Sequence, residues 1–142
     1  MIRLTKEEIL VLHQQLIDRY GGLPGIRDEG LLDSALNTLF QGFGKIDFYP
    51  TIPEKAVRLC FGLVKNHPFF DGNKRIGAMV LTVLLDLNHY SLRATKGELS
   101  KIIFQLAANE ISDTDLLQWV SIDWRNYPLF SRIVFSPFHW SV

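Results

Sequence analysis

The sequence has little of several features that mark particular classes of protein. It contains one cysteine, Cys60, so no intramolecular disulfide can form, and we expect a reducing compartment. Basic and acidic residues number 15 each, so a formal net charge of +0 gives no overall attraction to nucleic acid or anionic membranes. The first residues lack the apolar core of a signal peptide, and the longest uncharged apolar run, residues 76–85, is too short to span a bilayer. We therefore expect a cytoplasmic protein that binds neither membranes nor nucleic acid directly.

The composition is that of a globular protein, with 47% hydrophobic and 21% charged residues. A chain of 142 residues can bury about two-thirds of its unfolded surface in one core. We expect a single helical domain over residues 1–125. Residues 126–142 form a tail with two prolines and five aromatic side chains, which is too apolar for a solvated segment. We expect this tail to pack on the same domain, and covering a partner surface is the alternative.

Apolar residues recur at helical spacing in six segments, and most of these begin with a capping residue. Residues 73–88 carry apolar side chains on nearly every face, which is typical of a helix buried on all sides. The predicted fold class is therefore all-α, a compact bundle of about six helices around a buried central helix. The expected helix starts are Thr5, Asp28, Pro53, Asn73, Thr95 and Ser112.

Residues 43–53 do not fit a helix, because they combine a glycine and two prolines with an apolar-aromatic stretch. They predict a short extended flap, either a packed surface loop or an edge that binds a target segment by strand addition. Three single residues also carry predictions. Phe40 is expected to face the core, Cys60 to be a small core residue, and His13 to lie on the flank of the first helix without a function.

The nine residues from His67 to Arg75, which read His-Pro-Phe-Phe-Asp-Gly-Asn-Lys-Arg, directly precede the central helix. Asn73, Lys74 and Arg75 form its first turn, where unpaired N–H groups and the helix dipole already create positive potential. Two cations there are unfavourable unless an anion binds, and Gly72 leaves the backbone accessible to one. This stretch predicts a phosphate site of backbone amides, a lysine and an arginine.

His67 lies at the other end of the loop, where an imidazole can accept a proton from an attacking hydroxyl. Asp71 lies between them, and a carboxylate beside bound phosphates is a natural Mg²⁺ ligand. The loop contains no Ser, Thr or Cys, which favours direct in-line transfer over a covalent intermediate. Phe69 is expected to anchor the loop in the core. A metal pair of His67 and Asp71 is disfavoured, because Pro68 and Gly72 interrupt any helix there.

These residues resemble the signature loop of the Fic/Doc family, H-x-F-x-[D/E]-[G/A]-N-x-R, with every defining position filled. The stretch from Arg19 to Gly25, with Asp28 and Gly30 after it, is similar to the N-terminal part of the "death on curing" (Doc) branch. The residues Glu110-Ile-Ser112 before the last helix are similar too. The resemblance covers roughly residues 4–123 and implies a Fic/Doc-like helical fold.

Two positions differ from the branch of the family that transfers nucleotides. Lys74 replaces a second glycine, and Ala78 replaces a second arginine. The resemblance to Doc proteins, which share the lysine, implies a reversed nucleotide that presents its γ-phosphate, and hence a protein kinase. The alternatives are transfer of AMP on the same fold and a catalytically inactive module that binds a partner.

The resemblance also implies roles and partners. His67 is the expected general base, Asp71 orients Mg²⁺ or the phosphates, and ATP is the co-substrate. Gly72 and Asn73 shape the anion hole, while Lys74 and Arg75 hold phosphate. The expected target is a threonine of elongation factor Tu, with arrest of translation. The chain lacks the family's inhibitory motif [S/T]-x-x-x-E-[G/N], because residue 25, four before Glu29, is a glycine. A toxin restrained in trans by an antitoxin protein is therefore expected.

Overall fold

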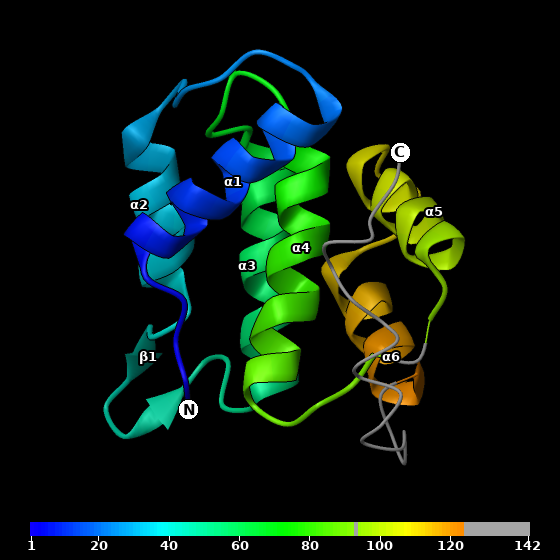
Figure 1. The fold of residues 1–142 in the computed structure, drawn as a ribbon. Coiled ribbons are helices and arrows are strands. Elements are labelled where there is room, and N and C mark those ends of the chain that lie inside the picture. Colours follow the sequence, from blue (N-terminus) through cyan, green and yellow to red (C-terminus); the bar gives the residue numbers. More distant parts are fainter. Residues whose placement is uncertain (93, 124–142) are drawn as a thin grey trace.

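The computed structural model describes residues 1–92 and 94–123 (Figure 1). Within these residues the fold is six helices and one small hairpin, which confirms the all-α prediction. The predicted tail, residues 126–142, and the domain boundary at residue 125 lie outside the described residues. The helices are α1 Lys6–Tyr20, α2 Glu29–Thr38, α3 Ile52–Asn66, α4 Asn73–Leu87, α5 Lys96–Ala107 and α6 Asp113–Asp123, and the hairpin strands are β1 Gly42–Phe43 and β2 Ile46–Asp47.

The helices begin where polar side chains satisfy first-turn amides, as the capping pattern predicted. Thr5 and Glu8 form a complete capping box at α1, and Asp28 accepts from the Leu31 N–H at α2. Ser112 and Asp115 exchange hydrogen bonds in the same way before α6. The predicted start of α3, Pro53, was one residue late, because Thr51 is the cap and the helix begins at Ile52.

The antiparallel pair α3 and α4 forms the centre of the bundle, and the other helices pack around it (Figure 1). Both helices are buried over most of their length, as predicted for residues 73–88. Cys60 is fully buried in this pair, and burial raises the pKa of its thiol, so the prediction of an unreactive core residue is confirmed. Among the described helices, none is long and apolar enough to cross a membrane.

The close approach of α3 and α4 depends on Gly77. A β-carbon at this position would lie 2.5 Å from Val64 Cγ2, inside van der Waals contact with a stiff, buried side chain. We expect Gly77→Ala to lower the free energy of unfolding by about 1–3 kcal/mol through overpacking. Gly97→Ala is the control, because its nearest neighbour would be 3.9 Å away, and alanine favours the helix. Urea unfolding of both variants tests this, and destabilisation of equal size would contradict it.

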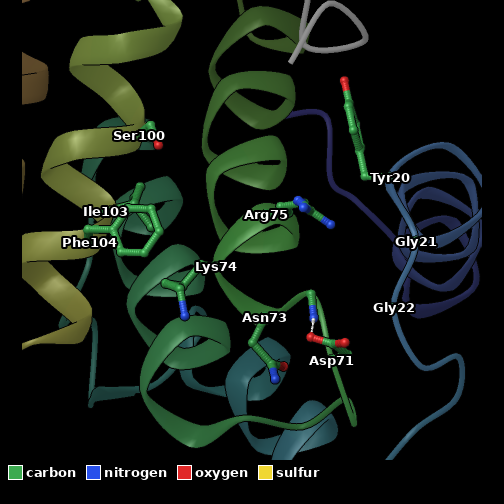
Figure 2. Close-up of a pocket in the computed structure, with 11 residues that line it drawn as sticks. Tyr20, Gly21, Gly22, Asp71, Asn73, Lys74, Arg75, Ser100, Ile103 and Phe104 are labelled. Atoms are coloured by element: carbon green, nitrogen blue, oxygen red, sulfur yellow. Dashed lines mark hydrogen bonds between the residues drawn. The ribbon is translucent and has the colours of Figure 1, made fainter. Parts of the chain in front are cut away.

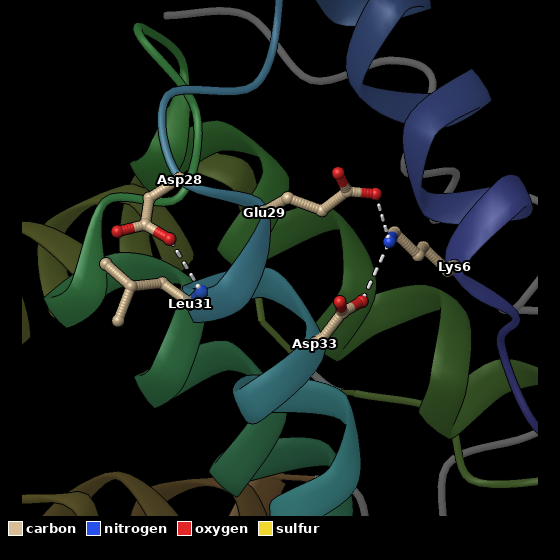
Figure 3. Close-up of polar contacts among 5 residues, drawn as sticks. All are labelled: Lys6, Asp28, Glu29, Leu31 and Asp33. Atoms are coloured by element: carbon tan, nitrogen blue, oxygen red, sulfur yellow. Dashed lines mark hydrogen bonds and ion pairs between the residues drawn. The ribbon is translucent and has the colours of Figure 1, made fainter.

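α2 is tied to α1 by Lys6, which pairs with Glu29 at 2.5 Å and with Asp33 at 2.8 Å (Figure 3). Hydrogen bonds that Lys6 donates to Asp33 and Glu29 raise its pKa. The pairs lie on the surface and contribute little stability, and the start of α2 is set by its cap, Asp28. This start matters for the functional loop, because the residues just before α2 run beside it (Figure 1).

The predicted extended flap is confirmed as the hairpin β1–β2, in which Gly42 pairs with Asp47. The hairpin lies at the opposite end of α3 from the loop that contains His67 (Figure 1). A target strand added to the hairpin would therefore lie about 20 Å from the loop, the length of a 15-residue helix. Phe40, which precedes the hairpin, is 43% exposed, so the prediction that it faces the core was wrong. Its ring lies instead under the guanidinium of Arg3, 3.9 Å away.

Candidate functional site

A cavity of about 290 Å³ opens at the N-terminus of α4 (Figure 2). The first turn of α4 lies between two walls, one from the end of α1 and the glycines after it, the other from α5. The lining therefore combines polar groups from the signature loop with apolar and aromatic side chains. The residues are Tyr20, Gly21, Gly22, Asp71, Gly72, Asn73, Lys74, Arg75, Ser100, Ile103 and Phe104.

The N-terminus of α4 differs from the other helix starts. Gly72 precedes the helix in the left-handed conformation, with φ 77° and ψ 17°, and no side chain caps the first-turn amides. The first turn contains no acidic residue. A β-carbon on Gly72 would be strained at this φ and would lie 3.4 Å from the ring of His13. The helix therefore offers uncapped N–H groups and positive potential, the combination that binds phosphate.

Lys74 and Arg75 add two positive charges and point to opposite walls of the cavity (Figure 2). The Lys74 ammonium lies 5.3 Å from the centre of the Phe104 ring on α5. The Arg75 guanidinium lies 5.1 Å from the Tyr20 ring at the end of α1. Within residues 1–92 and 94–123, no carboxylate pairs with either cation. Both charges therefore remain available to an anion between the walls.

The Asp71 carboxylate is fixed by backbone N–H groups. Oδ1 accepts from the Gly72 N–H at 2.9 Å, and Oδ2 accepts from the Leu23 N–H at 3.2 Å. Gly22 makes room for this contact, because a β-carbon there would lie 2.8 Å from Oδ2. Asp71 is exposed and lines the cavity, and each oxygen retains a lone pair.

In the described part of the chain, no three His, Cys, Asp or Glu residues gather into a metal site. The described residues therefore do not form a metal site in which the protein supplies all the ligands. A single fixed carboxylate beside a phosphate site fits Mg²⁺, which is often bound through one or two carboxylates, phosphate oxygens and water.

His67 ends α3 in the left-handed conformation, with φ 50° and ψ 57°, and its side chain is exposed. Its Nδ1 lies 3.4 Å from Nδ2 of Asn73, a contact too long to fix the tautomer. His67 does not line the 290 Å³ cavity, so the expectation that it faces the anion site stays a prediction. Its exposed imidazole contacts Asn73, which does line the cavity, and a protein hydroxyl could approach it from solvent.

Asn73 joins the two ends of the loop. Its side chain is 5% exposed, accepts from the Phe69 N–H at 3.0 Å and donates to the Phe69 carbonyl at 3.0 Å. This side chain therefore shapes the loop from within, and only the backbone of Asn73 is free for a ligand. The expected role of Asn73 in the anion hole stays a prediction. The two bonds to Phe69 suggest that Asn73 would shape the hole by holding the loop.

The loop is anchored by Phe69, which is 1% exposed, as predicted. Its ring stacks on His13 from α1, with centroids 3.7 Å apart and an interplanar angle of 11°. His13 Nε2 also lies 2.8 Å from the Asp71 carbonyl, which can only accept, so this nitrogen carries the proton. The prediction that His13 lies on the flank of its helix was wrong, because it is 2% exposed. The signal was present, since position 13 continues the apolar face of Ile9 and Leu16.

Burial of His13 should make the free energy of unfolding depend on pH. Loss of solvation lowers its pKa from 6.5, and the hydrogen bond to Asp71 offsets this only in part. As the pH falls through 6.5, the unfolded chain binds a proton that the folded chain refuses, so acid should destabilise the fold. We expect His13→Gln, which retains a donor for the Asp71 carbonyl, to lose less stability between about pH 7.5 and 5.5. Urea unfolding at both pH values tests this, and parallel losses would contradict it.

Comparison with known proteins identifies the family of the chain. The sequence model of the Fic/DOC family matches residues 3–85, more than half of the chain. The chain therefore belongs to the Fic/DOC family. It is 36% identical over 75 residues to a protein named Toxin Doc from Mycolicibacterium smegmatis (strain ATCC 700084 / mc(2)155), a match that covers 53% of this chain and 58% of the relative. It is 28% identical over 112 residues to Protein kinase doc of Escherichia phage P1, covering 79% of this chain and 87% of the relative.

Proposed function

We propose that this protein is a Doc-type toxin that transfers the γ-phosphate of ATP to a hydroxyl of a protein target. The observation that carries the proposal is the uncapped N-terminus of α4, whose two cations pair with no carboxylate of the described residues and whose Asn73 contacts His67. The name of the phage P1 relative, Protein kinase doc, supports the same reaction. The preferred target is a threonine of elongation factor Tu, with arrest of translation as the effect.

In the proposed reaction, the phosphates of ATP lie on the first-turn amides of α4, between Lys74 and Arg75. The target hydroxyl oxygen attacks the γ-phosphorus in line, and the bond to the oxygen that bridges the β- and γ-phosphates breaks. His67 accepts the hydroxyl proton, and ADP leaves. Asp71 would hold Mg²⁺, whose charge neutralises the phosphate oxygens when it is bound. The fixed amides and cations stabilise the transferred group without having to reorganise.

Lys74 favours γ-phosphate transfer in this proposal, because a side chain at this position narrows the space that internal phosphates would occupy. One observation supports AMP transfer as the second candidate. The Lys74 ammonium lies over the Phe104 ring on the α5 wall, 5.3 Å from its centre. If the lysine stays there when a nucleotide binds, the amides of α4 remain open to an α-phosphate.

Control by an antitoxin in trans is part of the proposal. The sequence lacks the inhibitory motif of self-restrained family members, and one of the relatives is named Toxin Doc. Co-expression of a neighbouring antitoxin should restore growth and yield a stable complex. A toxic chain that no such protein restrains would count against this part alone.

The experiment that tests the reaction is mass spectrometry of intact elongation factor Tu after incubation with the protein, ATP and Mg²⁺. We expect the mass to increase by one phosphoryl group. An increase by one adenylyl group supports the second candidate. No change, with this target and with a bacterial lysate as the source of others, supports a binding module without activity.

A further inference from the structure

The conformation of His67 must be held by contacts outside its own helix. The left-handed region is unfavourable for a residue other than glycine. His67 adopts it at the end of α3, with φ 50° and ψ 57°. The last carbonyls of a helix also lack intrahelical partners. A group that binds these carbonyls would satisfy them and would fix the direction in which the imidazole leaves the helix.

Arg27 provides that group. Its Nε–H donates to the carbonyl of His67 at 2.6 Å, and its Nη2–H donates to the carbonyl of Asn66 at 2.8 Å. The guanidinium therefore bridges the last two residues of this turn as a fork. Both bonds are charge-assisted and lie at a helix C-terminus, where the dipole favours a cation. A lysine, with a single ammonium, would not reproduce this planar geometry.

Arg27 is itself held against the loop by its backbone. Residues 25–28, here called the clamp segment, lie antiparallel to residues 68–70 (Figure 1). The N–H groups of Arg27 and Asp28 both donate to the Pro68 carbonyl, at 2.7 and 3.0 Å. The Phe70 N–H donates to the Gly25 carbonyl at 3.2 Å. Asp28 then caps α2, whose first turn binds Lys6 of α1 (Figure 3). The clamp segment thus connects the loop to two helices outside the α3–α4 pair.

Arg27 acts through His67 rather than on a ligand. It does not line the cavity at the N-terminus of α4, and its guanidinium faces carbonyls rather than the anion site. Its removal therefore leaves Asp71, Lys74 and Arg75 in place. The expected effect falls on the position of the imidazole and not on nucleotide binding.

We propose that Arg27 is a positioning residue for the transfer reaction, which locks His67 in the left-handed conformation by bridging the carbonyls of residues 66 and 67. This inference rests on the proposed function for its kinetic test, but the conformational part stands by itself. Displacement of a reacting group by about 1 Å can cost about 100-fold in rate. The rate of transfer, rather than the affinity for ATP, should therefore depend on the guanidinium.

The kinetic test compares Arg27→Ala and Arg27→Lys with Arg3→Ala. Arg3 is also exposed, but the N-terminal segment lies at the opposite end of the α3–α4 pair (Figure 1). We expect Arg27→Ala to lower kcat by about 10- to 100-fold with KM for ATP within about twofold. The kcat of Arg27→Lys should be lowered as well, and the kcat of Arg3→Ala should equal that of the wild type. Millimolar guanidinium should restore part of kcat in Arg27→Ala and nothing in His67→Ala. Unchanged kcat in Arg27→Ala, or a loss confined to KM, would overturn the inference.

A second readout does not require activity. The three-bond coupling between the amide and α protons of His67 reports its φ, and the ring signals report the surroundings of the imidazole. In Arg27→Ala we expect the coupling to move toward an average over conformations, while signals of the α4 first turn stay in place. A coupling identical to that of the wild type would overturn the inference even if the protein transferred nothing. Conversely, absence of phosphate transfer with an altered coupling would reject the proposed function and leave the role of Arg27 intact.

Discussion

Replacement of His67 by alanine is expected to reduce transfer to the target by about 100- to 10,000-fold, the usual contribution of a general base. The fold should survive, because the side chain is exposed and its contact with Asn73 is long, at 3.4 Å. Asn73 would keep its two bonds to Phe69, so the anion site should also persist. The variant should therefore lose kcat, retain its affinity for ATP, and unfold at the same urea concentration as the wild type.

The chain offers a matched control in His89. This histidine is also exposed and also adopts positive φ, 69°, directly after the far end of α4. His89→Ala removes the same kind of side chain from the same kind of backbone position. It should retain full activity, because His89 lies at the end of α4 opposite the signature loop. His67→Asn adds a second check, because asparagine tolerates the left-handed conformation and cannot act as a base. Full transfer by His67→Ala would remove the histidine from the mechanism.

The largest effect on stability is expected for Phe69→Ala. The Phe69 ring is 1% exposed and stacks on His13, so its removal leaves a cavity directly beneath the signature loop. Substitutions of this kind lower the free energy of unfolding by about 3–5 kcal/mol. The loss should extend to nucleotide binding, because Asp71 is held by His13 through its carbonyl. Urea unfolding with a common m-value measures the first effect, and titration with ATP measures the second.

Phe70 is the matched control for this prediction. It is the same residue type one position along, but its side chain is 55% exposed. Phe70→Ala should change the free energy of unfolding by less than about 1 kcal/mol. If both variants lost similar stability, the loop would not be anchored through Phe69 alone.

The helices and their starts could be predicted because their causes are local. Thr5 and Glu8 lie three residues apart, and so do Ser112 and Asp115, so the caps are visible in the sequence. The burial of α4 follows in the same way from apolar side chains on every face. The uncapped first turn of this helix could also be predicted, because its signs lie in consecutive residues. Gly72 has no side chain to cap the amides, and Lys74 and Arg75 stand where acidic residues are usual.

The polar contacts that hold the signature loop could not be predicted, because they join residues far apart in the chain. His13 and Asp71 are separated by 58 positions, and Arg27 and His67 by 40. Helical periodicity places His13 on an apolar face, but no local pattern gives it a partner. Arg27 lies in a glycine- and proline-rich stretch that predicts only a turn. The sequence therefore indicates the groups that could do chemistry and the Phe69 anchor, but not the polar contacts from His13 and Arg27 that hold the loop.

Lys55 is a third case of the same kind. It is only 7% exposed, although a lysine is rarely buried without partners. Its ammonium donates to the carbonyls of Leu39 and Tyr49, which lie on either side of the hairpin. A buried lysine needs such partners, and only the fold can bring both carbonyls to it. This contact ties both ends of the hairpin segment to α3.

The measurement that tests the central claim most directly uses ATP labelled at either the γ or the α position, in parallel reactions with elongation factor Tu and Mg²⁺. His67→Ala defines the background in each. The anion site at α4, with Lys74 in place of a glycine, predicts that label enters the target from the γ position only and that His67→Ala abolishes it. Label from the α position would show AMP transfer instead. Label from γ that persists in His67→Ala would contradict the assignment of the base.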